Sequence, residues 1–446
     1  MLKILVYGFP SLPLASLYFS IYVLLGEFYF DNYGLSLSII GSTFIIIRLI
    51  DAFSDPIMGY ISDNFISKYG KRKPWVIIGG TIFVFSTWFL FVPIFKSVGF
   101  NYFFFWLLMA TIGWTVAYAP YYAMGAELSM DYLERSNVTF CRELFTILGI
   151  VIASLLYSIS FDFEYNIFRN GISSKEGLIQ ICIFSSFAFL FSMIFFLFGH
   201  KDKKEFSNNK NNNFNIFEIF SSLQKQELMR KLLFSHFING LANGLPPALF
   251  VFFVNSILKS PELTGFLLFL YFLGALMGVP LWVFLSSKYD KHRVWCCAMI
   301  YACFIFMFVL FLEEGDLTLF VVICIFSGLA LSADLAIPSS IQADIIDLEF
   351  LKTGKRLTAQ FFAFWGVVSK AAVALSTGIA LILLDIVGFN SGDNNSTFVL
   401  FWLSFIYGGL PIILKIVSIY LMWDFKLDRK AHAEISLNLK IKKLKN

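Results

Sequence analysis

Charged residues are scarce in this chain of 446 residues: Asp, Glu, Lys and Arg make up 14%, against 58% apolar and 19% aromatic residues. A water-soluble protein carries about a quarter charged residues. This shortage, together with a mean hydropathy of +0.75, excludes a soluble enzyme and a disordered chain. The net charge of +4 is too small to attract a polyanion, so nucleic acid is excluded as a partner.

Signatures of catalytic or metal chemistry are missing as well. The six cysteines lie in apolar runs without C-x-x-C spacing, and the four histidines form no cluster. No HExxH or GxSxG motif occurs in the chain. These absences argue against a membrane enzyme, so we expect no cofactor apart from a coupling cation.

What the chain has instead is apolar runs of about 20 residues, the length of a helix that crosses a bilayer. Reading the runs between polar breaks predicts twelve spans. They lie at residues 7–30, 36–62, 75–95, 101–126, 138–160, 177–199, 232–256, 263–286, 294–312, 317–342, 358–387 and 397–423.

Basic residues occur in alternate loops. They cluster at residues 68–73, 288–293 and 352–356, in the central stretch 200–231 and in the tail 426–446. Because Lys and Arg are retained on the cytoplasmic side, we expect both termini and the central linker to be cytoplasmic. The expected location is the inner membrane of a bacterium.

An internal repeat relates the two parts of the chain. KYGKRKPW at 68–75 and KYDKHRVW at 288–295 each follow the second span of a six-span part. The repeat predicts an all-α membrane protein with two six-helix bundles, 1–199 and 232–425, which is the architecture of a secondary transporter with its substrate site between the halves. We expect a monomer that contacts lipid and a small-molecule substrate.

Charges inside the spans need a reason, because each costs about 2.5–3.5 kcal/mol at the bilayer centre. Arg48, Asp51 and Asp55 share one helical face of the second span, with Ser54 adjacent. Two carboxylates one turn apart either share a proton or take a cation. A Na⁺ or H⁺ site is one interpretation, and a static Arg–Asp bridge between helices is the other.

Two lysines also fall inside spans. Lys370 lies in span eleven, and we expect it to pair with Asp51 or Asp55, so that the lysine and the entering cation compete for these carboxylates. A purely structural pairing is the alternative. Lys415 lies near the inner end of span twelve, where we expect it to snorkel towards the cytoplasm.

Other polar residues are candidates for substrate contact. Arg142 either binds a ligand or pairs with its neighbour Glu143, while Asp334 lies well inside span ten. Span seven carries Asn239 and Asn243 before a Gly-Leu-Pro-Pro sequence that we expect to break the helix. In span four, polar side chains line a cavity or join helices. They are Thr115, Tyr118, Tyr121 and Tyr122.

Several motifs resemble those of the glycoside–pentoside–hexuronide:cation symporters of the major facilitator superfamily, of which melibiose permease is the type member. The most specific is RLIDAFSDPIMG at 48–59 followed by GKRKPW at 70–75. DYLER at 131–135, ADIID at 343–347 and TGKR at 353–356 continue the resemblance along the chain.

The resemblance implies the cation site more fully than the substrate site. It implies that Asp51, Ser54, Asp55 and Thr115 bind the coupling cation and that Lys370 is the family's lysine of span eleven. Its span-five arginine falls on or beside Arg142, and the tryptophan that stacks on the sugar is replaced by Tyr122.

The acidic residues that bind sugar hydroxyls in the family are absent here, where Ala15 and Tyr118 occupy their positions. We therefore predict a Na⁺- or H⁺-coupled symporter for a small solute such as a sugar or glycoside. The alternative is an amphipathic or anionic substrate, lysophospholipid-like or uronate-like, with Arg142 and Lys370 as counter-charges.

Overall fold

The structure is a computed structural model that describes most of the chain. The described residues are 2–64, 70, 72–95, 97–127, 132–165, 174–199, 226–353, 358–390 and 395–427. Most of the predicted linker (200–231) and tail (426–446) therefore lies outside the described residues.

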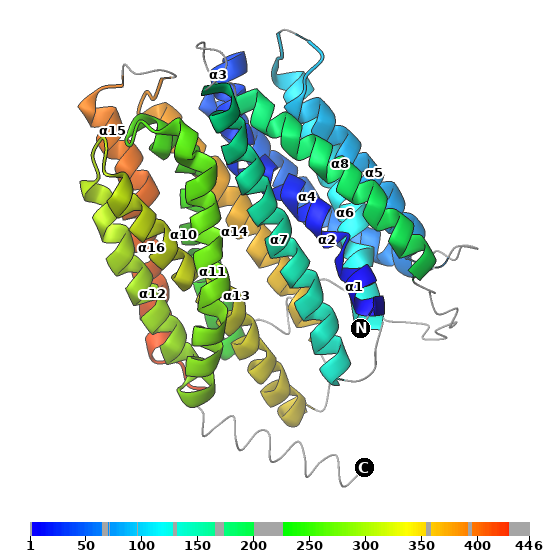
Figure 1. The fold of residues 1–446 in the computed structure, drawn as a ribbon. Coiled ribbons are helices and arrows are strands. Elements are labelled where there is room, and N and C mark those ends of the chain that lie inside the picture. Colours follow the sequence, from blue (N-terminus) through cyan, green and yellow to red (C-terminus); the bar gives the residue numbers. More distant parts are fainter. Residues whose placement is uncertain are drawn as a thin grey trace. The chain divides into compact units, whose positions relative to one another are not determined.

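All elements of the described residues are helices (Figure 1). Up to residue 199 they are α1 (Leu2–Gly8), α2 (Ser11–Val23), α3 (Leu25–Tyr33), α4 (Leu37–Asn64), α5 (Lys73–Phe91), α6 (Phe100–Glu127), α7 (Tyr132–Tyr165) and α8 (Ser174–Gly199). Later elements are α10 (Glu227–Ser256), η1 (Pro261–Leu263), α11 (Thr264–Lys288), α12 (Lys291–Met307), η2 (Phe308–Phe311), α13 (Leu317–Thr353), α14 (Thr358–Ile386), α15 (Thr397–Ser404), η3 (Phe405–Gly409) and α16 (Leu410–Trp423).

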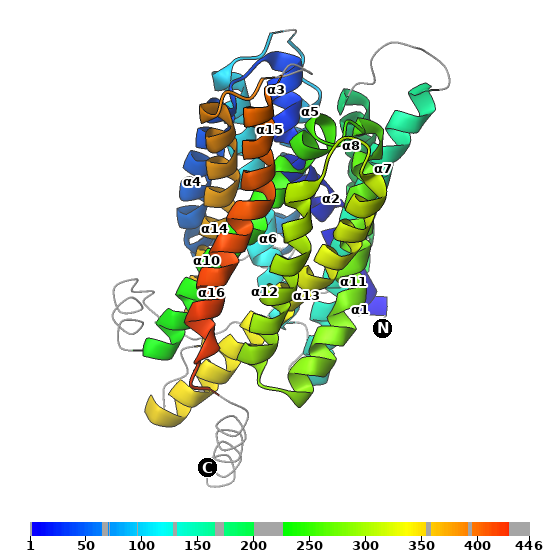
Figure 2. The same cartoon turned by 90° about the vertical axis from the view of Figure 1, so that its left-hand side faces the viewer.

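The helices coincide with the predicted spans, but three spans are subdivided. The ninth predicted span is α12 followed by the short 3₁₀ helix η2. The first predicted span is three helices, α1 to α3. Pro10 separates α1 from α2 because it lacks the N–H that would continue α1, and Leu24 separates α2 from α3. In the last span, η3 is a single π-helical turn containing Gly408 and Gly409. Figure 2 shows α15 and α16 as one continuous rod through this turn.

The predicted break in span seven is wrong, because α10 continues through Pro246 and Pro247. Close packing against α14 accounts for this. A Cβ on Gly244 would lie 1.9 Å from Ser376 Oγ. A neighbouring helix at such close range can support backbone groups that proline leaves without a partner.

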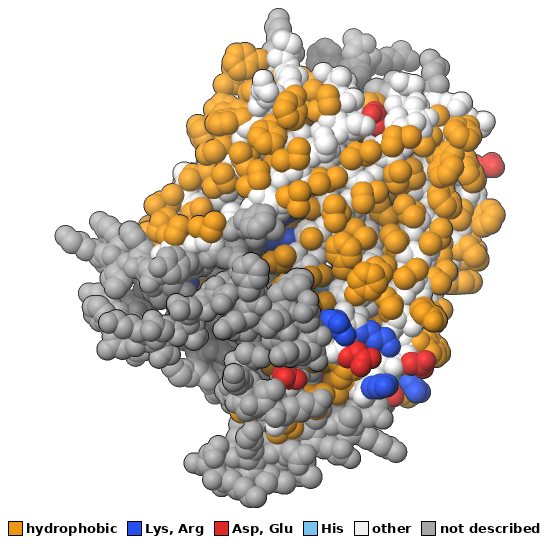
Figure 3. Space-filling model, turned by 180° about the vertical axis from the view of Figure 1, so that it is seen from behind, with side chains coloured by type: hydrophobic (Ala, Val, Ile, Leu, Met, Phe, Trp, Pro, Cys, Tyr) orange, Lys and Arg blue, Asp and Glu red, His pale blue; other side chains and the backbone are white. Residues whose placement is uncertain are grey.

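The surface is that of a membrane protein. Eleven helical stretches of the described residues are long and apolar enough to cross a bilayer. The remaining predicted span coincides with α4, whose 28 residues reach about 42 Å at 1.5 Å per residue. Figure 3 shows hydrophobic side chains over most of the described surface on one face, with charged side chains gathered near its lower edge. The chain is therefore a multi-pass membrane protein.

Contacts divide the chain into two compact units. Unit 1 comprises residues 1–207, 247–272 and 377–396, and unit 2 comprises residues 208–246, 273–376 and 397–446. Unit 1 therefore combines the end of α10, the start of α11 and the end of α14 with the helices before residue 200. The bundles at 1–199 and 232–425 rest on the sequence repeat and stay a prediction.

Within unit 1, α4 and α14 approach at a pair of glycines. A Cβ on Gly378 would lie 2.8 Å from the carbonyl oxygen of Gly41. We expect Gly378→Ala to lower stability by about 1–3 kcal/mol, the usual cost of overpacking. Gly366→Ala on the same helix is the matched control, because its Cβ would meet no atom within 4 Å. Thermal unfolding in detergent measures both variants, and an equal melting temperature for the two would contradict the close contact.

Candidate functional site

A buried ion pair lies on α4 in unit 1. Arg48 and Asp51 are one turn apart, and Arg48 Nη1 donates to Asp51 Oδ2 at 2.8 Å. Their side chains are 3% and 0% exposed. Because a buried carboxylate without a partner is costly, this pair accounts for the negative charge of Asp51 but leaves its other oxygen available.

The second carboxylate oxygen of Asp51 meets two hydroxyl groups. Thr115 Oγ1, on α6, donates to Asp51 Oδ1 at 2.6 Å. Ser54 Oγ lies 3.4 Å from Asp51 Oδ1 and 3.4 Å from Thr115 Oγ1, and donates to the Asp51 carbonyl at 2.9 Å. The side chain of Asp55 lies outside the described residues. The structure thus brings together three of the four residues predicted to bind the cation.

This group is a set of hard oxygen ligands beside a fixed positive charge. A carboxylate, two hydroxyls and a backbone carbonyl can ligate an alkali cation, or the carboxylate can bind a proton. Arg48 neutralises Asp51, so a further positive charge needs a second carboxylate. Asp55 follows four residues later on the same helix, the spacing at which side chains share a face.

Arg48 also contacts two tyrosines that the sequence interpretation did not single out. Its Nη2 donates to the Tyr18 hydroxyl at 2.5 Å, and its guanidinium carbon lies 4.3 Å from the centre of the Tyr22 ring. Its Nε is buried and has no hydrogen-bond partner among the described residues. The guanidinium is therefore only partly satisfied.

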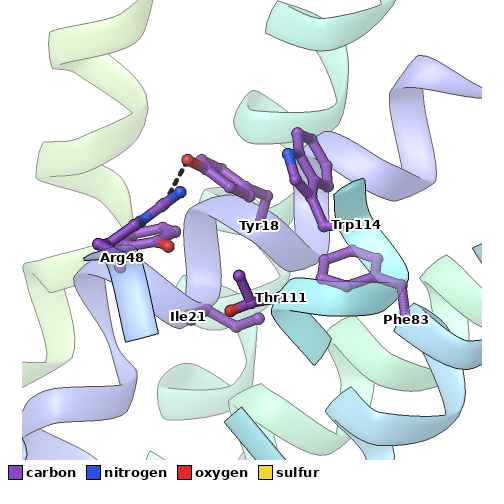
Figure 4. Close-up of a pocket in the computed structure, with 7 residues that line it drawn as sticks. Tyr18, Ile21, Arg48, Phe83, Thr111 and Trp114 are labelled. Carbon is purple, nitrogen blue, oxygen red and sulfur yellow. Dashed lines mark hydrogen bonds between the residues drawn. The ribbon is translucent and has the colours of Figure 1, made fainter. Parts of the chain in front are cut away.

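A small pocket adjoins Arg48 in unit 1 (Figure 4). It is lined by Tyr18, Ile21, Tyr22, Arg48, Phe83, Thr111 and Trp114. The pocket has room for about one water molecule, which can accept a hydrogen bond from a buried donor such as Arg48 Nε.

Five aromatic rings form a continuous row from this pocket, which we name the aromatic ladder. Its members in order are Tyr22, Tyr18, Trp114, Tyr118 and Tyr122. The successive ring centres are 4.6, 4.2, 4.2 and 4.3 Å apart. The ladder includes the predicted substrate residues of span four. By contrast, Tyr121 is fully buried and donates to the Tyr7 carbonyl, so it joins helices.

A second arginine lies at the far end of the aromatic ladder. The guanidinium carbon of Arg142 is 3.5 Å from the centre of the Tyr122 ring, and its Nη2 lies 2.7 Å from Glu143 Oε1. The Tyr118 hydroxyl donates to that of Tyr122 at 2.6 Å. Arg142 thus makes the predicted pair with its neighbour and also covers an aromatic face, so an arginine lies at each end of the ladder.

The expectation that Lys415 snorkels is wrong. Lys415 is 5% exposed, and its Nζ lies 3.0 Å from Asp334 Oδ2 and donates to Asn239 Oδ1 at 2.9 Å. Lys415 lies on α16 in the interior of unit 2, where the buried carboxylate of Asp334 compensates its charge. Lys415 and Asp334 are each a lone charge in an apolar span. A lone charge of this kind predicts a partner of opposite charge on another helix.

Two further donors complete this group, which we name the Asp334 network. Trp295 Nε1 donates to Asp334 Oδ1 at 2.7 Å, and Asn243 Nδ2 donates to Asp334 Oδ2 at 2.9 Å. Asn239, Asn243 and Asp334, all predicted to bind substrate, therefore bind one another and Lys415 here. Their role in substrate binding stays a prediction.

Lys370 lies half-buried on α14 in unit 2, whereas Asp51 belongs to unit 1. Their predicted competition stays a prediction. The preceding Ser369 contacts a histidine that the candidate site had omitted. His236 Nε2 lies 2.8 Å from Ser369 Oγ, and its ring stacks on Trp365 with centres 3.8 Å apart.

Known proteins with similar sequences are membrane transporters. The sequence model of the family described as "MFS/sugar transport protein" matches residues 6–429. The mouse sodium-dependent lysophosphatidylcholine symporter 1 is 23% identical, over 86% of this chain and 77% of that protein. A lactose permease of Lactobacillus delbrueckii subsp. bulgaricus is 24% identical, over 87% of this chain and 64% of the permease.

A solved structure supports the fold. The chain aligns with a variant of the nucleoside transporter NupG with a TM-score of 0.71 and 15% identity. The alignment covers 94% of this chain and all of the other.

Proposed function

Because this chain belongs to the family of MFS/sugar transport proteins, we propose that it is a Na⁺- or H⁺-coupled symporter that carries a sugar or glycoside by alternating access. It is a membrane transporter and not an enzyme. We place it in the cytoplasmic membrane of a bacterium as a monomer, with both termini in the cytoplasm.

The observation that carries the proposal is the oxygen cluster around Asp51. A static Arg48–Asp51 bridge would need only one carboxylate oxygen, yet Thr115 and Ser54 bring two hydroxyl oxygens to the other. Coupling follows if cation binding at Asp51 favours the conformation that binds substrate. Lys370 would then compete with the cation for the carboxylates of α4.

The aromatic ladder is the proposed substrate surface. The ring faces pack on one another within the ladder, so a sugar would contact the ring edges and the Tyr118 and Tyr122 hydroxyls. An arginine lies at each end of the ladder. At the Tyr122 end a carboxylate is present as well, because Glu143 Oε1 lies 2.7 Å from Arg142 Nη2 and accepts from the Tyr122 hydroxyl at 3.4 Å. A second candidate is an amphipathic or anionic substrate whose charged group competes with Glu143 for Arg142.

Uptake into sealed proteoliposomes tests the function. We would offer lactose, a hexuronide and lysophosphatidylcholine, each with an imposed Na⁺ gradient, an imposed pH gradient or neither. The proposal expects one compound to accumulate against its own gradient under one of the two ion gradients. If neither gradient drives accumulation of any compound that the protein binds, cation coupling is wrong.

Thr115→Val tests the hydroxyl ligand separately from the charge. If the Thr115 hydroxyl contributes about 1.4 kcal/mol to the free energy of cation binding, its removal weakens cation affinity about tenfold. We therefore expect the cation concentration that gives half-maximal transport to rise about tenfold, with the maximal rate less affected. Thr43→Val on α4 is the matched control, because Thr43 donates only to the Ile39 carbonyl of its own helix. An equal change in both variants would contradict a ligand role for Thr115.

A further inference from the structure

A second buried acid lies in unit 1, on a different helix from the cation cluster. Glu27 on α3 is 5% exposed, and Asn255 Nδ2, near the end of α10, donates to its Oε1 at 3.1 Å. Among the described residues none forms an ion pair with Glu27. A buried carboxylate that accepts from a neutral amide and has no cation as a partner is costly.

The two side chains share an unusual pattern of unsatisfied atoms. Glu27 Oε2 and Asn255 Oδ1 are both buried and lack a hydrogen-bond partner among the described residues. Both are acceptors, so neither can satisfy the other while Glu27 is ionised. A single proton on Glu27 Oε2 changes this. The carboxylic acid can then donate to Asn255 Oδ1 while the amide donates to Glu27 Oε1.

A second carboxyl group, that of Asp31, opposes ionisation of Glu27. Asp31 lies one turn further along α3 and acts on Glu27 through its charge and through a side-chain hydrogen bond. Tyr157, on α7, is fully buried near Glu27, and its neutral phenol adds no charge there. A second negative charge beside a buried carboxyl group favours its neutral form.

The Glu27–Asn255 contact joins parts of the chain that alternating access must separate. It connects the first predicted span to the seventh. In the same unit, Ser38 on α4 donates to Asp385 on α14, and Gly265 on α11 packs against the backbone of α7. In unit 1, spans of the first predicted half (α3, α4 and α7) therefore contact spans of the second predicted half (α10, α14 and α11). By the predicted topology this is the outer side.

We propose that Glu27 is a proton-binding site, occupied when the α3–α10 contact is closed and vacated to the outer solution when it opens. On closing, the carboxylate takes one proton from water and becomes a carboxylic acid paired with the Asn255 amide. On opening, it is hydrated and releases that proton. The inference rests on alternating access in this family and not on which cation binds at Asp51.

Distance measurements between spin labels test the proposal without a substrate. Labels at Ser97→Cys and Ser396→Cys occupy two exposed loop residues of unit 1. Cys297→Ser removes the one exposed cysteine of the described residues. If one proton is linked to closing, the closed-to-open ratio should rise by up to about tenfold for each pH unit of acidification.

Glu27→Gln is the decisive variant, because a Gln amide can form both hydrogen bonds with Asn255 without a proton. We expect this variant to stay closed at every pH. Asp31→Asn is the matched control on the same helix. It should keep the pH dependence, with a midpoint at lower pH because a neighbouring negative charge is removed. Asp51→Asn should also keep the pH dependence of closing, and this result would show that the proton site at Glu27 is distinct from the coupling site at Asp51.

A pH-independent ratio in the wild-type protein would overturn the proposal, and so would a wild-type response in Glu27→Gln. Should Glu27→Gln fail to fold, Asn255→Ala provides the second test. That variant keeps the acid but removes its partner, so its closing midpoint should move to lower pH. An unchanged midpoint would count against the proposal.

Discussion

Replacing Asp51 by Asn is expected to abolish gradient-driven accumulation of substrate and to leave downhill exchange at least partly intact. The amide keeps the size of the side chain but carries no charge to hold a cation or bind the proton. Without cation binding, an ion gradient has nothing to act on. Uptake into proteoliposomes with and without an imposed Na⁺ or pH gradient measures both activities.

Two controls accompany this variant. Asp316→Asn removes an exposed carboxylate between η2 and α13 and should leave uphill transport unchanged. Since Asp51→Asn also leaves Arg48 without its charged partner, its melting temperature is compared with that of the wild type. Uphill transport at the wild-type level in Asp51→Asn would show that the coupling site lies elsewhere.

The largest loss of stability is expected for Asp334→Asn. Asp334 and Lys415 are both almost fully buried, so removing the carboxylate leaves an uncompensated ammonium group among apolar side chains. Breaking a buried pair in this way costs about 3–5 kcal/mol. We expect a much lower yield of folded protein and a lower melting temperature in detergent.

The double variant Asp334→Asn with Lys415→Met separates charge from packing. It removes both charges and keeps side chains of similar length, so it should recover most of the lost stability. If the double variant is as unstable as Asp334→Asn alone, the loss arises from hydrogen bonds to Trp295 and Asn243 and not from the unpaired lysine.

Hydropathy and loop charge predicted the fold because a bilayer accepts few arrangements of the backbone. The errors lie where neighbouring helices decide the local structure. Pro246 and Pro247 were expected to break α10, yet the helix continues where it packs tightly on α14. Pro10 does end a helix, and its position near the start of the first span offered that signal.

Part of the cation site was readable from spacing alone, since Arg48, Asp51 and Asp55 share a helical face. Thr115 is 64 residues from Asp51, so only the family resemblance brought it into the predicted site. Tyr18 and Tyr22 were missed because 19% of the residues are aromatic, and no single ring is conspicuous among them. The Lys415–Asp334 pair was missed although each lone intramembrane charge called for a partner.

The central claim is that the Asp51 carboxylate, with Ser54 and Thr115, binds the coupling cation. The most direct test is an equilibrium titration of the purified protein with Na⁺ at several pH values, followed by tryptophan fluorescence, in the wild type and in Asp51→Asn. We expect a saturable response to Na⁺, or to H⁺ in a proton-coupled protein, that is lost in Asp51→Asn. The same response with the same midpoint in both proteins would contradict the claim.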